Sequence, residues 1–513
     1  MSIRDLQRIG LRAPLLLIAL LSSAGCSAAA RLPAPQAVQA DAAVMATREA
    51  WTVHLRPADH GAKQALQAVY APAQPLLWIS EGEPTPQALA LLRILQSADT
   101  YGLEPRDYDV DELMGLANTL AAADTRSEEP AKPDDVTIAA QRFAQFDVSL
   151  SAAALKLVAD LHYGRIDPRA AGFELGAPRP DDLDLAAVLK ALARSPDLER
   201  TLASVEPQFY HYRLLEGALA RYRSLAAEQV AQQPTLADDV RKIDLTLERW
   251  RWLPPFQTPP IIVNIPEFRL FAFRTRADRA ASILQMNVIV GRTFPRMRTP
   301  VFAADMKSVI FRPYWDVPHS ITVREMLPKI RANPDFLAAQ HLEIVQSSRA
   351  GTQVLPPTPE SLEALASGAA RLRQRPGPDN ALGLIKFDLP NFHDVYLHST
   401  PAQQLFKERR RAFSHGCIRV SDPVALATYV LRDTPGDWTP ERIRAAMNGA
   451  ETRRVPLARP IPVMIVYATV LAKEDGEVLF FNDLYGQDRR LERLLGLAPV
   501  PGAERVLHAS SNP

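Results

Sequence analysis

The chain of 513 residues is long enough for three or four domains, each with its own hydrophobic core. Its 59 Lys and Arg nearly balance 58 Asp and Glu, and the net charge of +1 gives no electrostatic footprint for nucleic acid or for an acidic membrane surface. Hydrophobic residues at 47% and charged residues at 23% are typical of a globular protein, and two cysteines exclude a disulfide-stapled scaffold.

The N-terminus has the pattern of a bacterial export signal. Three arginines within residues 4–12 precede an apolar run over 14–21, and small residues follow over 22–30. A basic region, a short apolar region and a small-residue cleavage zone are typical of a secretory signal peptide. The apolar run is far shorter than the ~20 residues that a transmembrane span needs. We therefore expect residues 1–26 to direct the protein to the periplasm.

The two cysteines have different expected roles. Ala24-Gly25-Cys26 resembles a lipoprotein signal, which would lipidate Cys26 and tether the protein to a membrane, whereas residues 28–30 offer an ordinary peptidase site. Both alternatives stay open, and under either one Cys26 cannot form an internal disulfide with Cys417. Cys417 is then a lone thiol in an oxidising compartment, where Ser or Ala would serve a purely structural role. It is therefore a candidate functional residue.

Hydrophobic periodicity predicts an α+β protein of several domains. Apolar residues recur at three- and four-residue spacing over 87–96 and 148–158, which is typical of helices, and short β-branched runs such as 261–265 and 286–290 follow. We expect a linker over 27–45, a helical domain over 46–227, a short connection over 228–240, a mainly-β domain over 241–485 and a tail over 486–513. A mixed segment over about 320–383 interrupts the strands and is interpreted as an insertion that caps a cleft.

The residues able to carry chemistry lie in two short segments, Tyr396-Leu397-His398-Ser399-Thr400-Pro401 and Ser414-His415-Gly416-Cys417-Ile418-Arg419-Val420. A thiol attacks as its thiolate, so Cys417 needs a neighbouring base, and His398 and His415 are candidates. Gly416 permits a tight bend that could direct backbone N–H groups at a developing oxyanion. Arg419 could bind a substrate carboxylate or hold the loop in place.

Two other interpretations of these residues stay open. Cys417 could be a small buried core residue, as lone cysteines often are. His393, His398, His415 and Cys417 could instead bind zinc, although no second close pair of Cys or His gives the spacing of a zinc finger or ribbon. We favour nucleophilic catalysis, and we expect no metal and no organic cofactor.

Together, these segments resemble the L,D-transpeptidases with a YkuD-like catalytic domain. The family motif places a His before Ser/Thr-His-Gly-Cys, and the 16 residues between His398 and His415 fit its spacing. Further resemblance to the scaffold-bearing branch of Gram-negative bacteria lies in the segments 161–165, 248–254, 264–268, 290–292, 313–318 and 373–383. The resemblance covers roughly residues 50–485.

The resemblance implies a helical scaffold domain followed by a mainly-β YkuD-like catalytic domain, with the capping insertion at about 320–383. It implies that Cys417 is the nucleophile and that His398 is the base and acid, oriented by the backbone carbonyl of Ser399. It further implies that Ser414, His415 and Gly416 shape the catalytic loop. Arg419 would support that loop or bind substrate, and Tyr396 would bind substrate. Members of this branch commonly carry a peptidoglycan-binding module between the two domains, where this chain has only 228–240.

The resemblance also implies a reaction in the cell wall. Cys417 would attack the third residue of a peptidoglycan tetrapeptide stem, and the diaminopimelate amine of another stem would resolve the thioester into a 3→3 cross-link. Carbapenems would acylate the same cysteine. Water as acceptor would make the protein an L,D-carboxypeptidase, and a lipoprotein lysine would make it a wall-anchoring enzyme. A non-catalytic wall scaffold is the alternative of another class.

Overall fold

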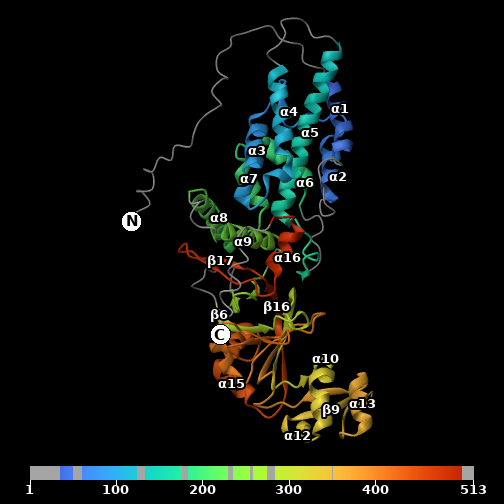
Figure 1. Cartoon of the computed structure of the whole chain (residues 1–513), viewed down its shortest axis with the longest axis vertical. Coiled ribbons are helices and arrows are strands. Elements are labelled where there is room, and N and C mark those ends of the chain that lie inside the picture. Colours follow the sequence, from blue (N-terminus) through green and yellow to red (C-terminus); the bar gives the residue numbers. More distant parts are fainter. Residues whose placement is uncertain are drawn as a thin grey trace.

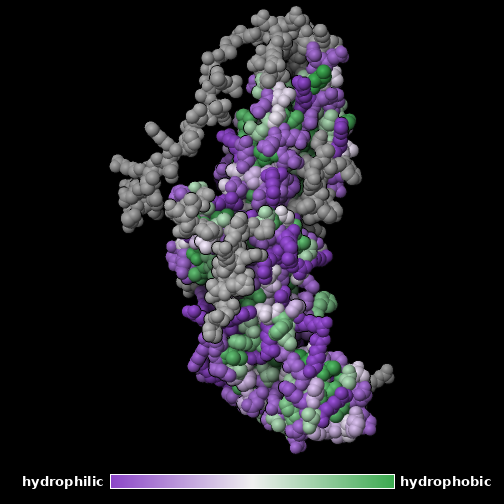
Figure 2. Space-filling view, viewed as in Figure 1, coloured by the Kyte–Doolittle hydropathy of each residue, from purple (hydrophilic) through white to green (hydrophobic). Residues whose placement is uncertain are grey.

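The computed structural model describes residues 35–49, 60–123, 133–175, 183–228, 235–254, 258–273, 284–348 and 351–498. The chain is elongated, with a helical region at one end, a β-rich region in the middle and a small mixed region at the other end (Figure 1). Over the face drawn in Figure 2, most residues are hydrophilic and the hydrophobic ones form small separate groups. No helix of these ranges combines the length and the apolar character that a bilayer span requires. The predicted signal segment 1–26, with Cys26, lies outside the described residues.

The helical region is built around one long central helix. Its helices are α1 (Pro35–Glu49), α2 (His60–Val69), α3 (Pro86–Gln96), α4 (Val110–Ala123), α5 (Pro133–Tyr163), α6 (Leu185–Arg194) and α7 (Leu198–Val205). Helix α5 contacts the other six. Its segment 150–161 is buried almost throughout because neighbours cover it on every side. The prediction of a helical N-terminal domain is confirmed.

Helix α1 occupies part of the expected linker over 27–45. We predicted a tether there because the segment is rich in Ala and Pro, but from Pro35 onward it is helical. Val38, Ala42 and Ala46 repeat every four residues and are buried, and α1 packs against α5. Small side chains at this spacing let two helices approach closely, which is the physical reason for the difference.

Two helices link the helical region to the β-rich region. They are α8 (Tyr210–Glu228) and α9 (Thr235–Arg251), which pack against each other. Residues 235–240, expected in the short connection, are therefore the first residues of α9. The buried side chains of both helices, including Leu215, Leu219, Ile243 and Leu247, join the core of the β-rich region and not that of the scaffold helices. Apolar residues at helical spacing in α9 explain why it is ordered there.

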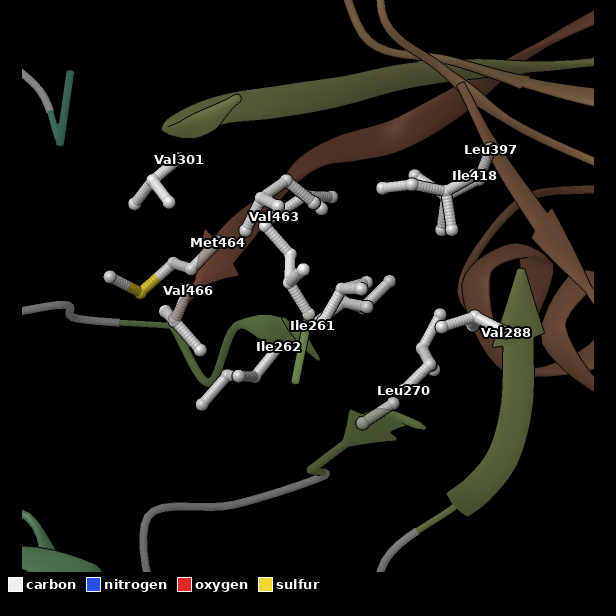
Figure 3. Close-up of a cluster of buried hydrophobic side chains, with 14 of the residues drawn as sticks. Ile261, Ile262, Leu270, Val288, Val301, Leu397, Ile418, Val463, Met464 and Val466 are labelled. Atoms are coloured by element: carbon white, nitrogen blue, oxygen red, sulfur yellow. The ribbon is translucent and has the colours of Figure 1, made fainter. Parts of the chain in front are cut away.

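The β-rich region is one sheet that closes on itself. Its strands run in the order β12-β13-β15-β6-β5-β4-β16-β7-β3, and β12 also pairs with β7. They are β3 (Phe173–Glu174), β4 (Ile261–Asn264), β5 (Arg269–Ala272), β6 (Leu284–Gly291), β7 (Val301–Phe311), β12 (Ile385–Asp388), β13 (Leu397–His398), β14 (Ala412–Ser414), β15 (Ile418–Val420) and β16 (Arg453–Val466), with β14 pairing β6. Aliphatic side chains from β4, β5, β6, β13, β15 and β16 gather in one core (Figure 3).

Three further helices and a hairpin complete this region. Helices α14 (Pro423–Leu431) and α15 (Pro440–Met447) add buried residues to the core of the sheet. The hairpin of β17 (Val470–Ala472) and β18 (Val478–Phe480) contacts α8. Helix α16 (Gln487–Leu494) buries Leu491 in the same core, so the expected tail over 486–513 begins with an ordered helix. A single leucine on a polar helix carries little sequence signal, which explains the difference.

The capping insertion forms a unit of its own. Strands β8 (Trp315–Asp316), β9 (Leu342–Ser348), β10 (Gly351–Leu355) and β11 (Arg371–Gln374) make a sheet in the order β10-β9-β11-β8. Helices α10 (His319–Ile321), α11 (Leu327–Ala332), α12 (Phe336–Ala339) and α13 (Pro359–Ser367), with the π-helical turn Thr322–Met326, enclose a separate small core. The insertion thus begins slightly before the expected residue 320.

Candidate active site

The two motif segments are brought together by two neighbouring strands. β13 and β15 are parallel, with Leu397 opposite Ile418 and His398 opposite Arg419. Leu397 and Ile418 are fully buried in the core of the sheet. Because side chains alternate along a strand, their neighbours on either side project from the opposite face. That face therefore carries Tyr396, His398, Cys417 and Arg419.

His398 is held as a neutral imidazole. Its side chain is buried, and its Nδ1 lies 2.6 Å from the backbone oxygen of Ser399. A carbonyl oxygen can only accept, so Nδ1 carries the proton and Nε2 keeps its lone pair. Burial and, to a smaller extent, the charge of Arg419 lower the pKa of His398 to about 3. The ring is therefore able to accept a proton at neutral pH.

The segment that orients His398 is anchored through Ser399. The Ser399 hydroxyl accepts a hydrogen bond from the backbone N–H of Leu384 at 2.8 Å and donates to the oxygen of Leu382 at 3.1 Å. Gly383 lies between them at a φ of +63°, and a Cβ there would be 2.2 Å from Ser399 Oγ. Only glycine allows the backbone at residue 383 to come this close to Ser399. The contact therefore helps to hold the Ser399 carbonyl, which accepts the hydrogen bond from His398.

Cys417 is partly exposed at the surface and carries a protonated thiol. Its Sγ lies 3.6 Å from the backbone oxygen of Asp394, to which the thiol donates. Burial raises the pKa of Cys417, while hydrogen bonds from Tyr396 lower it in part. Burial and the nearby thiol in turn raise the pKa of the Tyr396 phenol well above its ordinary value. The resting pair is thus a thiol and a neutral imidazole, not an ion pair.

Tyr396 forms a wall beside these groups. Its ring lies 5.8 Å from the His398 ring in an edge-to-face arrangement, and Lys386 Nζ lies 4.1 Å from the ring centroid. Its hydroxyl oxygen also accepts a hydrogen bond from the Trp315 side chain of the capping insertion. Tyr396 therefore connects the cap, the base and the thiol.

The bend before Cys417 is fixed by buried polar side chains. Gly416 has a φ of +127°, which other residues rarely adopt. Its carbonyl accepts from Thr299 Oγ1 at 2.7 Å, and its N–H donates to Ser414 Oγ at 3.1 Å. The N–H of Ile418 donates to the oxygen of Tyr396 at 3.0 Å. These two N–H groups are already bonded within the loop, and the expectation that backbone N–H groups around Cys417 face an oxyanion stays a prediction.

His415 points to the capping insertion. Its Nε2 lies 2.8 Å from Glu325 Oε1, on the π-helical turn of the cap. The contact joins the catalytic loop to an element 90 residues earlier in the chain. His415 thereby holds cap and loop together, which fits the expectation that it shapes the loop.

Arg419 is a charged group with spare hydrogen-bonding capacity. Its Nε is buried and has no hydrogen-bond partner among the residues that the structure describes. Burial lowers its pKa, while the nearby Cys417 raises it and Arg292 lowers it. A guanidinium so placed can bind a carboxylate through its planar fork.

The four residues considered as zinc ligands are not grouped around one point. His393 lies with Nε2 at 3.1 Å from Glu174 Oε2, on β3 near the scaffold helices, and its ring stands beside Phe302. His415 is bonded to Glu325 of the cap, and His398 is bonded to the backbone oxygen of Ser399. Within the described ranges, no three His, Cys, Asp or Glu side chains are grouped as metal ligands.

Several residues of the site were not found from the sequence. Lys386, Thr299, Glu325, Trp315 and Gly383 all lie outside the two motif segments. For Lys386 a signal existed, because it alternates with the buried Ile385 and Phe387 and so projects from the face that carries His398. Trp315 and Gly383 lie in the segments 313–318 and 373–383, which the family resemblance included without giving either residue a role. Thr299 and Glu325 act through contacts between distant segments, which spacing along the chain does not reveal.

Comparison with known proteins agrees with this geometry. The L,D-transpeptidase catalytic domain of the YkuD family matches residues 259–440, and a scaffold domain matches residues 64–219. A Haemophilus influenzae protein named "Putative L,D-transpeptidase" is 31% identical over 252 residues, which is 49% of this chain. The match also covers 49% of that relative, so it spans about half of its length. The chain therefore contains an L,D-transpeptidase catalytic domain of the YkuD family, preceded by a scaffold domain.

Proposed function

We propose that the protein is a peptidoglycan L,D-transpeptidase that forms 3→3 cross-links through a thioester on Cys417. The observation that carries the proposal is the neutral His398, with its Nε2 lone pair free of the proton, on the same face of adjacent strands as the Cys417 thiol. Peptidoglycan lies outside the cytoplasmic membrane, which agrees with the export signal predicted over residues 1–26.

In the donor stage, His398 Nε2 accepts the proton of the Cys417 thiol, and the thiolate attacks the carbonyl carbon of the third stem residue. The tetrahedral intermediate then collapses and breaks the peptide bond to the terminal D-alanine. His398 returns its proton to the leaving amine, so D-alanine departs and the thioester remains. Arg419 pairs with a carboxylate of the stem in this proposal, which is supported by its lack of a hydrogen-bond partner for Nε in the described part of the chain.

In the acceptor stage, the side-chain amine of a diaminopimelate residue on another stem attacks the thioester. His398 takes a proton from that amine, and the Cys417 sulfur leaves and regains it as a thiol. The cap touches both sides of the site, through Trp315 on Tyr396 and through Glu325 on His415. A cap that contacts the residues on either side of Cys417 would limit the access of water to a thioester there, which supports an amine acceptor over hydrolysis.

The test is to incubate the purified protein with disaccharide-tetrapeptide and to identify the products by mass spectrometry, beside Cys417→Ala and His398→Ala. A dimer lighter by one alanine is expected from the unchanged protein. We expect no product from Cys417→Ala and about 10²- to 10⁴-fold less from His398→Ala. Tripeptide alone would indicate an L,D-carboxypeptidase. Equal activity of Cys417→Ala would contradict the proposal, and no product together with no carbapenem acylation of Cys417 would favour a wall scaffold.

A further inference from the structure

A cavity of about 530 Å³ lies where the catalytic sheet meets helices α8 and α9 and the β17–β18 hairpin. Figure 1 shows these elements side by side at the junction of the helical and β-rich regions. Phe271 of β5 and Gln285 and Asn287 of β6 form one wall, and Tyr210, His211 and Trp250 form another. The volume is within the range of sites that enclose small organic ligands.

The cavity walls combine aromatic faces, amides and charges. Arg269 Nη2 donates to Gln285 Oε1 at 2.8 Å, so this amide is held in one orientation. Trp250 is only 7% exposed, yet its Nε1 has no hydrogen-bond partner in the described part of the chain, and the same holds for Nδ1 of His211. Neither nitrogen is accessible from the cavity, so these two rings offer aromatic faces and not hydrogen bonds to a ligand there.

The cavity lies on the same face of the sheet as Cys417. Asn287 and Ile289 alternate with the core residues Met286 and Val288, and Ile289 is opposite Arg419 in the antiparallel pairing of β6 with β15. Asn287 is therefore four residues along and one strand across from Cys417. At ~3.4 Å per residue and ~4.8 Å between strands, this separation is about 14 Å.

Arg411 joins the cavity to the catalytic loop. It lines the cavity, donates from Nη2 to the backbone oxygen of Phe268 at 3.0 Å, and lies 3.3 Å from Asn287 Oδ1. Arg411 immediately precedes β14, which leads through Ser414 into the bend at Gly416. One continuous stretch of chain thus borders both sites.

We propose that this cavity binds sugar rings of the glycan strand that carries the reacting stem peptide. The inference rests on the proposed function, in which Cys417 attacks the third stem residue. Three extended residues span about 10 Å, so the sugar at the root of the stem begins close to the near edge of the cavity. Sugar rings present apolar C–H faces that stack on aromatic side chains, and their acetamido groups pair with amides.

The test measures binding without turnover. Full-length protein with Cys417→Ala is titrated calorimetrically with three probes: an N-acetylated peptidoglycan disaccharide without stem, the disaccharide-tetrapeptide and the free tetrapeptide. In this background we add Phe271→Ala or Tyr210→Ala, of which Tyr210 is 39% exposed and tolerates truncation. Leu89→Ala on α3, at a 46% exposed position in the scaffold region, is the control. Both cavity variants should weaken the two disaccharide probes about tenfold and leave the free tetrapeptide unchanged.

Two results would overturn the inference. Failure of the stem-free disaccharide to bind the protein would show that the cavity is no sugar site. An equal loss of affinity for the free tetrapeptide would show that it holds peptide instead. Neither result depends on catalysis. Sugar binding that is lost in the cavity variants would support the inference even if the unchanged protein made no cross-links. The sugar site and the proposed reaction can therefore fail independently of each other.

Discussion

Buried charged side chains have different partners at the two ends of the catalytic domain. At the scaffold end, the fully buried Glu248 accepts hydrogen bonds from the N–H groups of Arg165 at 2.5 Å and Ile166 at 3.1 Å. Its second carboxylate oxygen lies 3.6 Å from Nη1 of the fully buried Arg251. Arg251 in turn donates to Tyr212 and to the backbone of Tyr101 in the scaffold region. Charges from both regions are thus paired across their junction.

At the catalytic end the charges are enclosed but not paired in this way. Arg419 has a buried Nε without a partner among the described residues, and His398 is kept neutral by burial. The junction charges face opposite charges, Glu248 against Arg165 and Arg251, whereas no ion pair of Arg419 occurs among the described residues. A buried charge that faces an opposite charge holds two regions in one arrangement, whereas one without an ionic partner keeps its capacity for a charged ligand. The comparison predicts that substitutions at the junction change stability and that those near Cys417 change activity.

The largest effect on stability is expected from Glu248→Ala. It leaves Arg251 and Arg165 buried without their carboxylate and should lower the free energy of unfolding by about 3–5 kcal/mol. Glu248→Gln keeps an acceptor for the N–H groups and should cost less. Urea unfolding followed by circular dichroism measures both. Glu441→Ala, which removes an exposed partner of Arg444, is the control and should change nothing measurable. Equal stability of Glu248→Ala and the unchanged protein would refute the role of the junction.

Two glycines of the catalytic end separate steric from backbone effects. Gly383→Ala places a Cβ 2.2 Å from Ser399 Oγ and 2.8 Å from the backbone nitrogen of Thr400. The segment that orients His398 must then shift, and we expect about a 10²-fold loss of cross-linking rate. Gly416→Ala meets nothing closer than 3.6 Å, so only its φ of +127° opposes it, at about 1–3 kcal/mol of strain. Dimer formation should therefore be slower in Gly383→Ala than in Gly416→Ala. A slower rate in Gly416→Ala would contradict the clash expected between a Cβ at residue 383 and Ser399.

The bond between cap and loop should show energetic coupling. His415→Ala and Glu325→Ala each remove the contact at 2.8 Å, and each should reduce the cross-linking rate about tenfold. Because both substitutions break the same interaction, the double variant should lose little more than either single one. Steady-state rates of the four proteins give the coupling. Effects that simply multiply would mean that the two side chains act separately.

The pairing of the two motifs could be predicted from the sequence, whereas the contacts that support it could not. The alternation of Leu397 and Ile418 with polar neighbours indicates two strands, and the family resemblance joins them. The contact of His415 with Glu325 and that of Gly383 with Ser399 link segments whose spacing carries no periodic signal. At the junction, Arg165 and Glu248 lie in segments that the resemblance included, but nothing in their spacing shows that they pair. In α1, the small residues resemble a linker. Tertiary packing decides these elements, and local propensity does not.

The smallest expected effect is an absence of titration near neutral pH. Burial lowers the pKa of His398 to about 3 and raises that of Cys417, so imidazole and thiol both stay neutral between these limits. The rate of Cys417 alkylation by iodoacetamide should therefore rise only at alkaline pH, as the thiolate forms, with no step near pH ~6.5. His398→Ala should leave this profile nearly unchanged, because the resting thiol has not yet given its proton to the ring. A resting thiolate–imidazolium pair would instead give rapid alkylation across neutral pH that falls in acid and is lost in His398→Ala. That pattern would mean that His398 carries the proton before substrate binds. Both ends of the catalytic domain would then hold paired charges, and the contrast between them would be wrong.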